Sequence, residues 1–314
     1  MNVDKTDVPA PAHELIRMRS PRRARLVWRM AAACLVLLGA AHAGQAGSPQ
    51  AAALGLYDIT DKLPGHPAVS YFDLLKQVVP DFAVGENGAS GRKIGNLRHI
   101  AGPDSGAGSP DVVKISSLQA LKFEAQGKPA IAVLADIGEA EDSVEQPVVL
   151  AVFEDGESPR LLDFVDVGMD RLTGFGSPKL LRIGPHDQAI FTHSEHFNSS
   201  ENFSSHALIF VRDGKLQLID TFSTFSARLC SAKETQSLSF RTGPAAGRGP
   251  YFAVTASLKD QRVRTGETCE GEKRLAPYTK TVSTSYAWNA AKGRFIAKSD
   301  GIKRLEKATG GRLE

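Results

Sequence analysis

From residue 112 onward, short runs of alternating apolar and polar residues recur along the chain and are interrupted by turn residues. Alternation with a period of two sends successive side chains to opposite faces, which is typical of half-buried β-strands. The best-specified example is the segment 206–220, in which Asp213 and Gly214 separate two such runs. Both residue types tolerate positive φ, so the pattern predicts a two-residue hairpin turn.

This turn also predicts a register for the two strands that it joins. Counting outward from the turn pairs Val211 with Leu216 and Ile209 with Leu218. Ala207 shares their face, because the side-chain pattern of a strand repeats every two positions. One register therefore satisfies both the turn chemistry and the burial of the apolar side chains.

A similar arrangement occurs three times, with four predicted strands in each copy. The predicted strands are 118–123, 129–137, 147–154 and 160–167 in the first copy, 179–183, 187–197, 205–212 and 215–223 in the second, and 237–240, 251–258, 278–288 and 294–298 in the third. Such antiparallel meanders build β-propellers and some β-sandwiches. We therefore expect an all-β, mainly antiparallel fold of three meander units over residues 112–314, either propeller-like or a β-sandwich.

The segment 44–111 has a different pattern. Ser70 and Asp73 form a capping-box sequence, apolar residues follow at helical spacing, and a proline ends the run. This predicts one short N-terminal helix over 70–79. Seven glycines between 84 and 111 then predict a long loop.

Residues 1–43 have the pattern of a secretory signal peptide. Six arginines and no acid lie between Arg17 and Arg29, and a 12-residue apolar run, 30–41, follows. A membrane-spanning helix needs about 20 apolar residues, whereas a signal peptide needs roughly 7–15. The small residues before Gly44 predict cleavage there, although a start at Met18 would give a leader of more ordinary length. We expect a periplasmic or secreted protein.

Removal of the leader changes the charge of the protein. The whole chain has 38 basic and 35 acidic side chains, of which the leader holds seven and three, so the mature part carries about one net negative charge. A basic surface for nucleic acid is therefore not indicated. We expect no nucleic-acid partner and no membrane association after cleavage. A protein or another envelope component is the expected kind of partner.

The two cysteines of the mature part, Cys230 and Cys269, are predicted to form a disulfide. Disulfides persist in the oxidising compartments that exported proteins reach. The third cysteine, Cys34, lies in the leader.

The densest polar cluster lies at 192–206 and gives the candidate binding residues. These are His193, Glu195, His196, Asn198 and His206. Neighbouring imidazoles and carboxylates can bind a metal or act as a general acid and base. On a continuous strand, however, the first two face one side and His196 faces the other, so a His-x-x-His chelate cannot form.

A structural interpretation of the same cluster is also open. If Phe197 and Ser204 close a hairpin, Glu195 lies opposite His206 as a cross-strand ion pair. The polar tip between the strands then resembles any loop whose side chains bond their own backbone.

The loop 138–145 supplies a candidate calcium site. Glu139, Glu141 and Asp142 offer the oxygen ligands that calcium prefers, although the alternating ladder of an EF-hand is absent from the sequence. No other cofactor is predicted. The sequence also contains no Gly-x-Ser-x-Gly, no His-Glu-x-x-His and no phosphate-binding glycine motif.

These observations favour a non-enzymatic binding or structural module of the cell envelope. Its loops 138–145, 197–203 and 259–276 occupy equivalent places in the three copies, so we expect them on one edge of the fold, where a partner would bind. The alternative is a metal-dependent hydrolase that uses His193, Glu195, His196 and His206.

Overall fold

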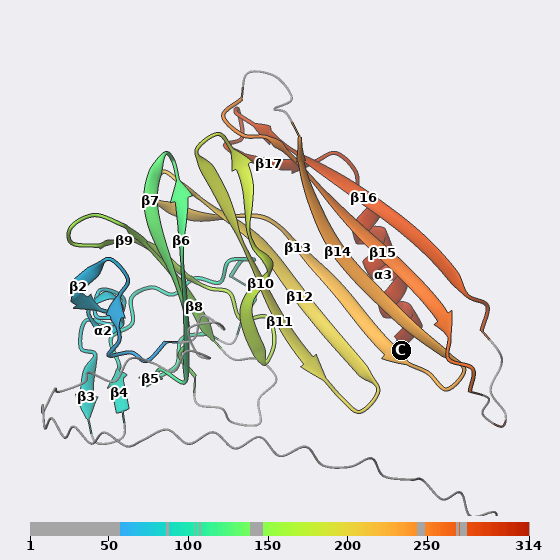
Figure 1. Cartoon of the computed structure of the whole chain (residues 1–314), viewed down its shortest axis with the longest axis horizontal. Coiled ribbons are helices and arrows are strands. Elements are labelled where there is room, and N and C mark those ends of the chain that lie inside the picture. The colour runs from blue at the N-terminus through green and yellow to red at the C-terminus, as the bar shows by residue number, and fades with distance from the viewer. Residues whose placement is uncertain are drawn as a thin grey trace, which may run out of the picture. The chain divides into compact units, whose positions relative to one another are not determined.

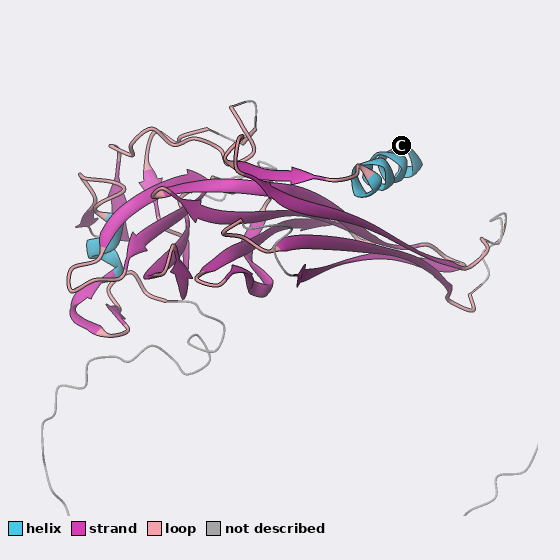
Figure 2. Ribbon diagram, turned by 90° about the horizontal axis from the view of Figure 1, so that it is seen from above, coloured by secondary structure: helices cyan, strands magenta, loops and turns pink. Residues whose placement is uncertain are grey.

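Two antiparallel β-sheets make up most of the computed structural model of this chain (Figure 1). The structure describes residues 57–85, 88–103, 105–106, 108–138, 147–243, 249–267, 270 and 275–313. Two helices occur among these residues (Figure 2). The expectation of an all-β, mainly antiparallel fold is therefore confirmed.

The first sheet has four strands in sequence order. They are β6 (Ser117–Ala125), β7 (Lys128–Asp136), β8 (Val148–Glu154) and β9 (Arg160–Asp166). Each strand pairs with the next, so this sheet is the first predicted meander. Its central strands β7 and β8 are buried on both faces because another layer covers each side.

The second sheet has eight strands, also in sequence order. They are β10 (Leu172–Gly184), β11 (Asp187–Phe197), β12 (Glu201–Arg212), β13 (Lys215–Arg228), β14 (Ala232–Gly243), β15 (Ala253–Arg264), β16 (Tyr278–Asn289) and β17 (Arg294–Ala297). These strands correspond to the second and third predicted copies. The two copies are not separate units, because β13 pairs with β14 at Ser226–Arg228 and joins them in one sheet. Neither the propeller-like form nor the β-sandwich is confirmed.

The hairpin at Asp213-Gly214 has the predicted register. Val211 pairs with Leu216, and Ile209 pairs with Leu218. Asp213 has φ 50° and Gly214 has φ 69°, the backbone that this two-residue turn requires.

The N-terminal segment packs on the first sheet. It contains β1 (Lys62–Leu63), β2 (His66–Ser70), α2 (Tyr71–Leu75), β3 (Ala83–Gly85), β4 (Gly88–Gly91) and β5 (Val113–Lys114). The capping box between Ser70 and Asp73 forms as predicted. The helix is shorter than the predicted 70–79: it ends at Leu75, and tighter turns lead from there to Val79.

Three apolar clusters hold these layers together. One lies between the two sheets, where Leu150 of β8 and Ile209 of β12 are fully buried. A second lies between the first sheet and the N-terminal segment. The third lies on the opposite face of the second sheet, under the C-terminal helix α3 (Gly301–Leu313), which contributes Ile302 and Leu305. The second sheet therefore has two differently covered faces.

Candidate functional site

The predicted His/Glu cluster is divided between the two faces of the second sheet. His193 pairs directly with His206, and Glu195 pairs with Ser204. The predicted pairing of Glu195 with His206 is therefore wrong by two residues. The cause is the turn, because Phe197 pairs with Asn202 rather than Ser204 and the strands continue further toward the tip.

Asn198 explains why this turn is so tight. Its Oδ1 accepts the backbone N–H of Ser200 at 3.1 Å and of Glu201 at 2.9 Å, and its Nδ2 donates to Glu201 Oε2 at 3.1 Å. Every polar atom of the Asn198 side chain is thus bonded within the turn. This residue therefore supports the hairpin.

One face carries His193, Glu195 and His206. The His206 ring stacks on Phe191 with a centroid distance of 5.4 Å, and its Nε2 lies 2.9 Å from Thr224 Oγ1. Glu195 Oε1 is 3.9 Å from His193 Nε2. This arrangement is a packed edge of the apolar cluster under α3 rather than an open imidazole pair.

A polar groove of about 300 Å³ begins beside His193 and Glu195. Its wall includes residues of β6, β7 and β10: Ser117, Gln119, Asp136 and Thr173. Burial raises the pKa of Asp136 above the ordinary value of an aspartate.

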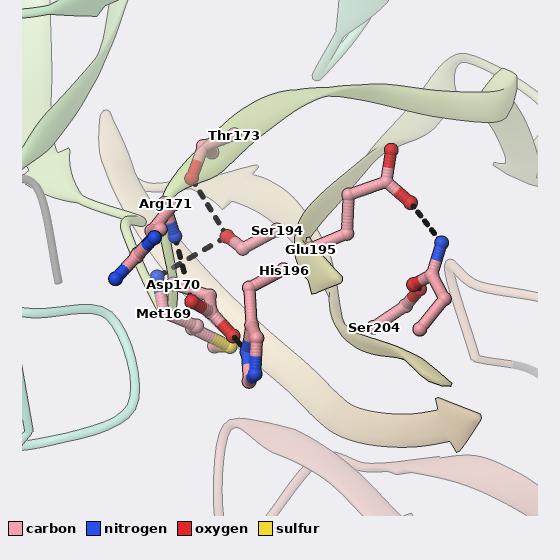
Figure 3. Close-up of polar contacts among 9 residues, drawn as sticks. Met169, Asp170, Arg171, Thr173, Ser194, Glu195, His196 and Ser204 are labelled. Atoms are coloured by element: carbon pink, nitrogen blue, oxygen red, sulfur yellow. Dashed lines mark hydrogen bonds and ion pairs between the residues drawn. The ribbon is translucent and has the colours of Figure 1, made fainter. Parts of the chain in front are cut away.

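The other face carries His196, which is held by Asp170 (Figure 3). The distance between His196 Nδ1 and Asp170 Oδ2 is 2.7 Å. Next to this pair, Ser194 Oγ accepts the backbone N–H of Met169 at 3.1 Å and lies 2.7 Å from Thr173 Oγ1. The figure shows His196 and Glu195 pointing away from each other, as strand alternation requires.

A row of hydroxyl groups crosses the sheet on this second face. Register places Thr173, Ser194, Ser205 and Ser223 side by side on β10, β11, β12 and β13. Ser205 and Ser223 line a cavity of about 350 Å³, which we call the Ser205 cavity. It is lined by His99, Ala101, Ser105, Gly106, Gly168, Met169, Ser205, Thr221, Phe222 and Ser223.

The wall opposite the sheet is formed by His99, Ala101, Ser105 and Gly106, and two hydrogen bonds fix the His99 ring in it. His99 Nε2 lies 3.0 Å from the carbonyl oxygen of Gly168, and its Nδ1 accepts the backbone N–H of Ala101 at 3.2 Å. These bonds place the ring proton on Nε2. Gly106 has φ 91°, and a Cβ there would lie 2.7 Å from His99 Cδ2. Only glycine fits this approach of backbone to imidazole.

The remaining predicted sites are not described by the structure. Glu139, Glu141, Asp142 and Cys269 lie outside the described residues. Within the described part of the chain, no group of three or more His, Cys, Asp and Glu is placed to hold a metal ion. No helix of that part is long and apolar enough to span a membrane.

The expected gathering of the loops 138–145, 197–203 and 259–276 on one edge stays a prediction, because residues 139–146, 268–269 and 271–274 lie outside the described residues. The β11–β12 and β15–β16 connections lie at the same end of the second sheet, because an even number of reversals separates them. Both are shorter than predicted, since β12 begins at Glu201 and β15 continues to Arg264.

The Ser205 cavity was missed by sequence reasoning, although a signal was present. The core-facing positions of β12 run Val211, Ile209, Ala207 and then Ser205. The change from apolar to hydroxyl side chains on one face marks the point where the core ends and the cavity begins.

No protein-family model, curated protein or solved structure matches this chain.

Proposed function

We propose that this protein is exported to the cell envelope and acts there as a non-enzymatic binding protein. Its ligand would be a small, neutral, hydroxyl-rich molecule held in the Ser205 cavity. The observation that carries the proposal is that three hydroxyl residues of the sheet, Ser205, Thr221 and Ser223, line one cavity together with His99 and Ser105.

The polar character of the lining supports this ligand class. Hydroxyl groups both donate and accept, so they match the hydroxyls of a polyol or sugar. Among the described residues that line the cavity, none is Lys, Arg, Asp or Glu. An ionised ligand would therefore lose hydration without gaining an opposite charge, which is costly. The volume, about 350 Å³, is at the lower end of the range of small-molecule sites.

The sheet face has more support as the binding surface than the loop edge does. Asn198 is fully engaged within its own turn, whereas the cavity hydroxyls face an open volume. The metal-dependent hydrolase has less support, because His193 and His196 lie on opposite faces.

The test is a binding titration with neutral sugars and polyols. Glucose, galactose, mannose, ribose and mannitol are titrated calorimetrically into the mature protein. We expect at least one to bind, and the double variant Ser205→Ala, Ser223→Ala to weaken it about tenfold, since each lost hydrogen bond costs roughly 0.5–1.5 kcal/mol. Failure of all five probes to bind would overturn the ligand class.

A matched control separates the cavity from hydroxyl content in general. Ser257 Oγ and Ser283 Oγ form a 2.7 Å pair on β15 and β16, outside the cavity. The double variant Ser257→Ala, Ser283→Ala removes the same number of hydroxyls and should leave the affinity unchanged.

Export is tested separately. The full chain is expressed in a bacterium, and the N-terminus of protein released from the periplasm is sequenced. We expect it to begin at Gly44. Recovery of uncleaved protein from the cytoplasm alone would contradict export without affecting the cavity.

A further inference from the structure

The strand β13 is paired with its neighbour β14 over only a short stretch. Cα pairing between them covers Ser226–Arg228 and Lys233–Thr235. By contrast, β12 pairs with β13 along almost its whole length. Before Ser226, therefore, the edge of β13 that faces away from β12 has no paired strand among the described residues.

Side chains take the place of the missing strand at this edge. Asp220 Oδ1 accepts the backbone N–H of Thr221 at 2.8 Å. Lys303 Nζ donates to the carbonyl oxygen of Thr221. Glu306 Oε1 accepts the backbone N–H of Ser223 at 2.8 Å. Two of these three contacts come from α3, which packs against β13 and β16.

The helix side chains are themselves held in place. Lys303 Nζ lies 3.2 Å from Glu306 Oε2 and 3.5 Å from Asp220 Oδ1, and it sits over the Phe222 ring at 5.7 Å. Tyr286 Oη of β16 donates to Asp220 Oδ2 at 2.6 Å. The helix is thus fixed to β13 by a connected polar network in addition to its buried Ile302 and Leu305.

The two strand residues that α3 holds are also walls of the Ser205 cavity. Thr221 and Ser223 face the cavity with their side chains, and their backbone groups face the gap that α3 fills. The contacts of α3 are thus made to the backbone of two residues that line the cavity.

We propose that Lys303 and Glu306 are positioning residues of the Ser205 cavity, and that docking of α3 on β13 is coupled to occupancy of the cavity. This inference rests on the proposed function where it concerns ligand. The C-terminal helix holds the β13 edge in the geometry that the ligand requires, and a bound ligand in turn stabilises the docked helix, because coupling between two sites is reciprocal.

The first test needs no ligand. In Glu306→Ala the Ser223 amide loses its acceptor, so its hydrogen exchange, measured by NMR, should accelerate about tenfold or more. The methyl resonance of Thr221, inside the cavity, should shift in the same variant. Glu306→Gln keeps a side-chain oxygen and should restore both signals toward wild type. Lys307→Ala changes an exposed residue of the same helix and should leave both unchanged.

The second test uses the sugar that binds most tightly among the five probes. Glu306→Ala should weaken it about three- to tenfold, with rescue by Glu306→Gln and no effect of Lys307→Ala. Unchanged exchange and an unchanged Thr221 methyl signal in folded Glu306→Ala would overturn the positioning role. Altered NMR signals with unaltered affinity would overturn the coupling. If wild type binds no probe, the proposed function fails, and the NMR experiment still decides the role of α3.

Discussion

His193 and His206 lie directly opposite each other on β11 and β12, with ring centroids 6.5 Å apart. The Nδ1 atoms of both rings are buried, and neither has a hydrogen-bond partner within the part of the chain that the structure describes. Burial, and secondarily the charge of His193, lower the pKa of His206 from 6.5 to about 4. His206 is therefore neutral near pH 7.

This depressed pKa predicts a loss of stability in mild acid. The unfolded chain takes up a proton on His206 below pH 6.5, whereas the folded chain resists protonation until about pH 4. Neutral His206 contributes its full share to the free energy of unfolding above pH 6.5. This share, about 3 kcal/mol in total, is lost as the pH falls from 6.5 to about 4. Between pH 7 and pH 4, the free energy of unfolding of wild type should fall by about 2 kcal/mol or more beyond the fall seen in His206→Gln. Urea titrations across this pH range measure it.

The control for this experiment is the exposed His186, whose side chain is 72% exposed. His186→Gln removes an imidazole from the surface of the protein. Its pH profile should follow that of wild type. Parallel profiles for His206→Gln and wild type would show that His206 is not the group responsible.

The strands were predictable because their signal is local. Alternation between neighbouring residues predicts a strand without knowledge of its partner, and the segments identified in this way correspond to β6–β17. The junction between β13 and β14 has no such signal, since it depends on pairing of distant edges. Two predicted units therefore became one sheet.

Turn chemistry explains why one hairpin register was predicted and the other was not. Asp213-Gly214 admits one tight turn, and the strands on both sides follow from it. The turn at Asn198 is closed by a side chain that bonds two backbone N–H groups, which a residue pattern does not specify. The Ser205 cavity is still less local, because its second wall, which includes His99 and Ser105, lies about a hundred residues earlier in the chain.

Substitution of Gly176 in β10 by a residue with a side chain is predicted to destabilise the fold for steric reasons. A Cβ at this position would lie 2.2 Å from Cδ1 of Phe191, which is buried in the cluster under α3. Gly176→Ala should lower the free energy of unfolding by about 1–3 kcal/mol, the usual cost of overpacking a core. Gly156→Ala is the matched control, because a Cβ there meets nothing within 4 Å. Equal urea midpoints for the two variants would contradict the close contact.

The last prediction concerns Cys230, in the turn between β13 and β14. Its carbonyl oxygen accepts a hydrogen bond from Thr265 Oγ1 at 2.6 Å, and the backbone N–H of Thr265 donates to the carbonyl oxygen of Ser231 at 3.3 Å. Thr265 thus anchors the start of the β15–β16 connection to this turn, four residues before Cys269. A disulfide between the two cysteines would restrict the unfolded chain and so stabilise the fold by about 4 kcal/mol in the chain-entropy model.

We therefore expect mature protein recovered under oxidising conditions to have no free thiol and to lose about 2–4 kcal/mol of stability when reduced. Mass spectrometry of unreduced peptides identifies the bond, and urea titration with and without reductant gives its effect. The double variant Cys230→Ser, Cys269→Ser should unfold at the same urea concentration in both conditions. Two reactive thiols in the exported protein would rule the bond out, and the turn would then be held by hydrogen bonds, including those of Thr265 and the one from the Leu229 N–H to the Ala232 carbonyl oxygen.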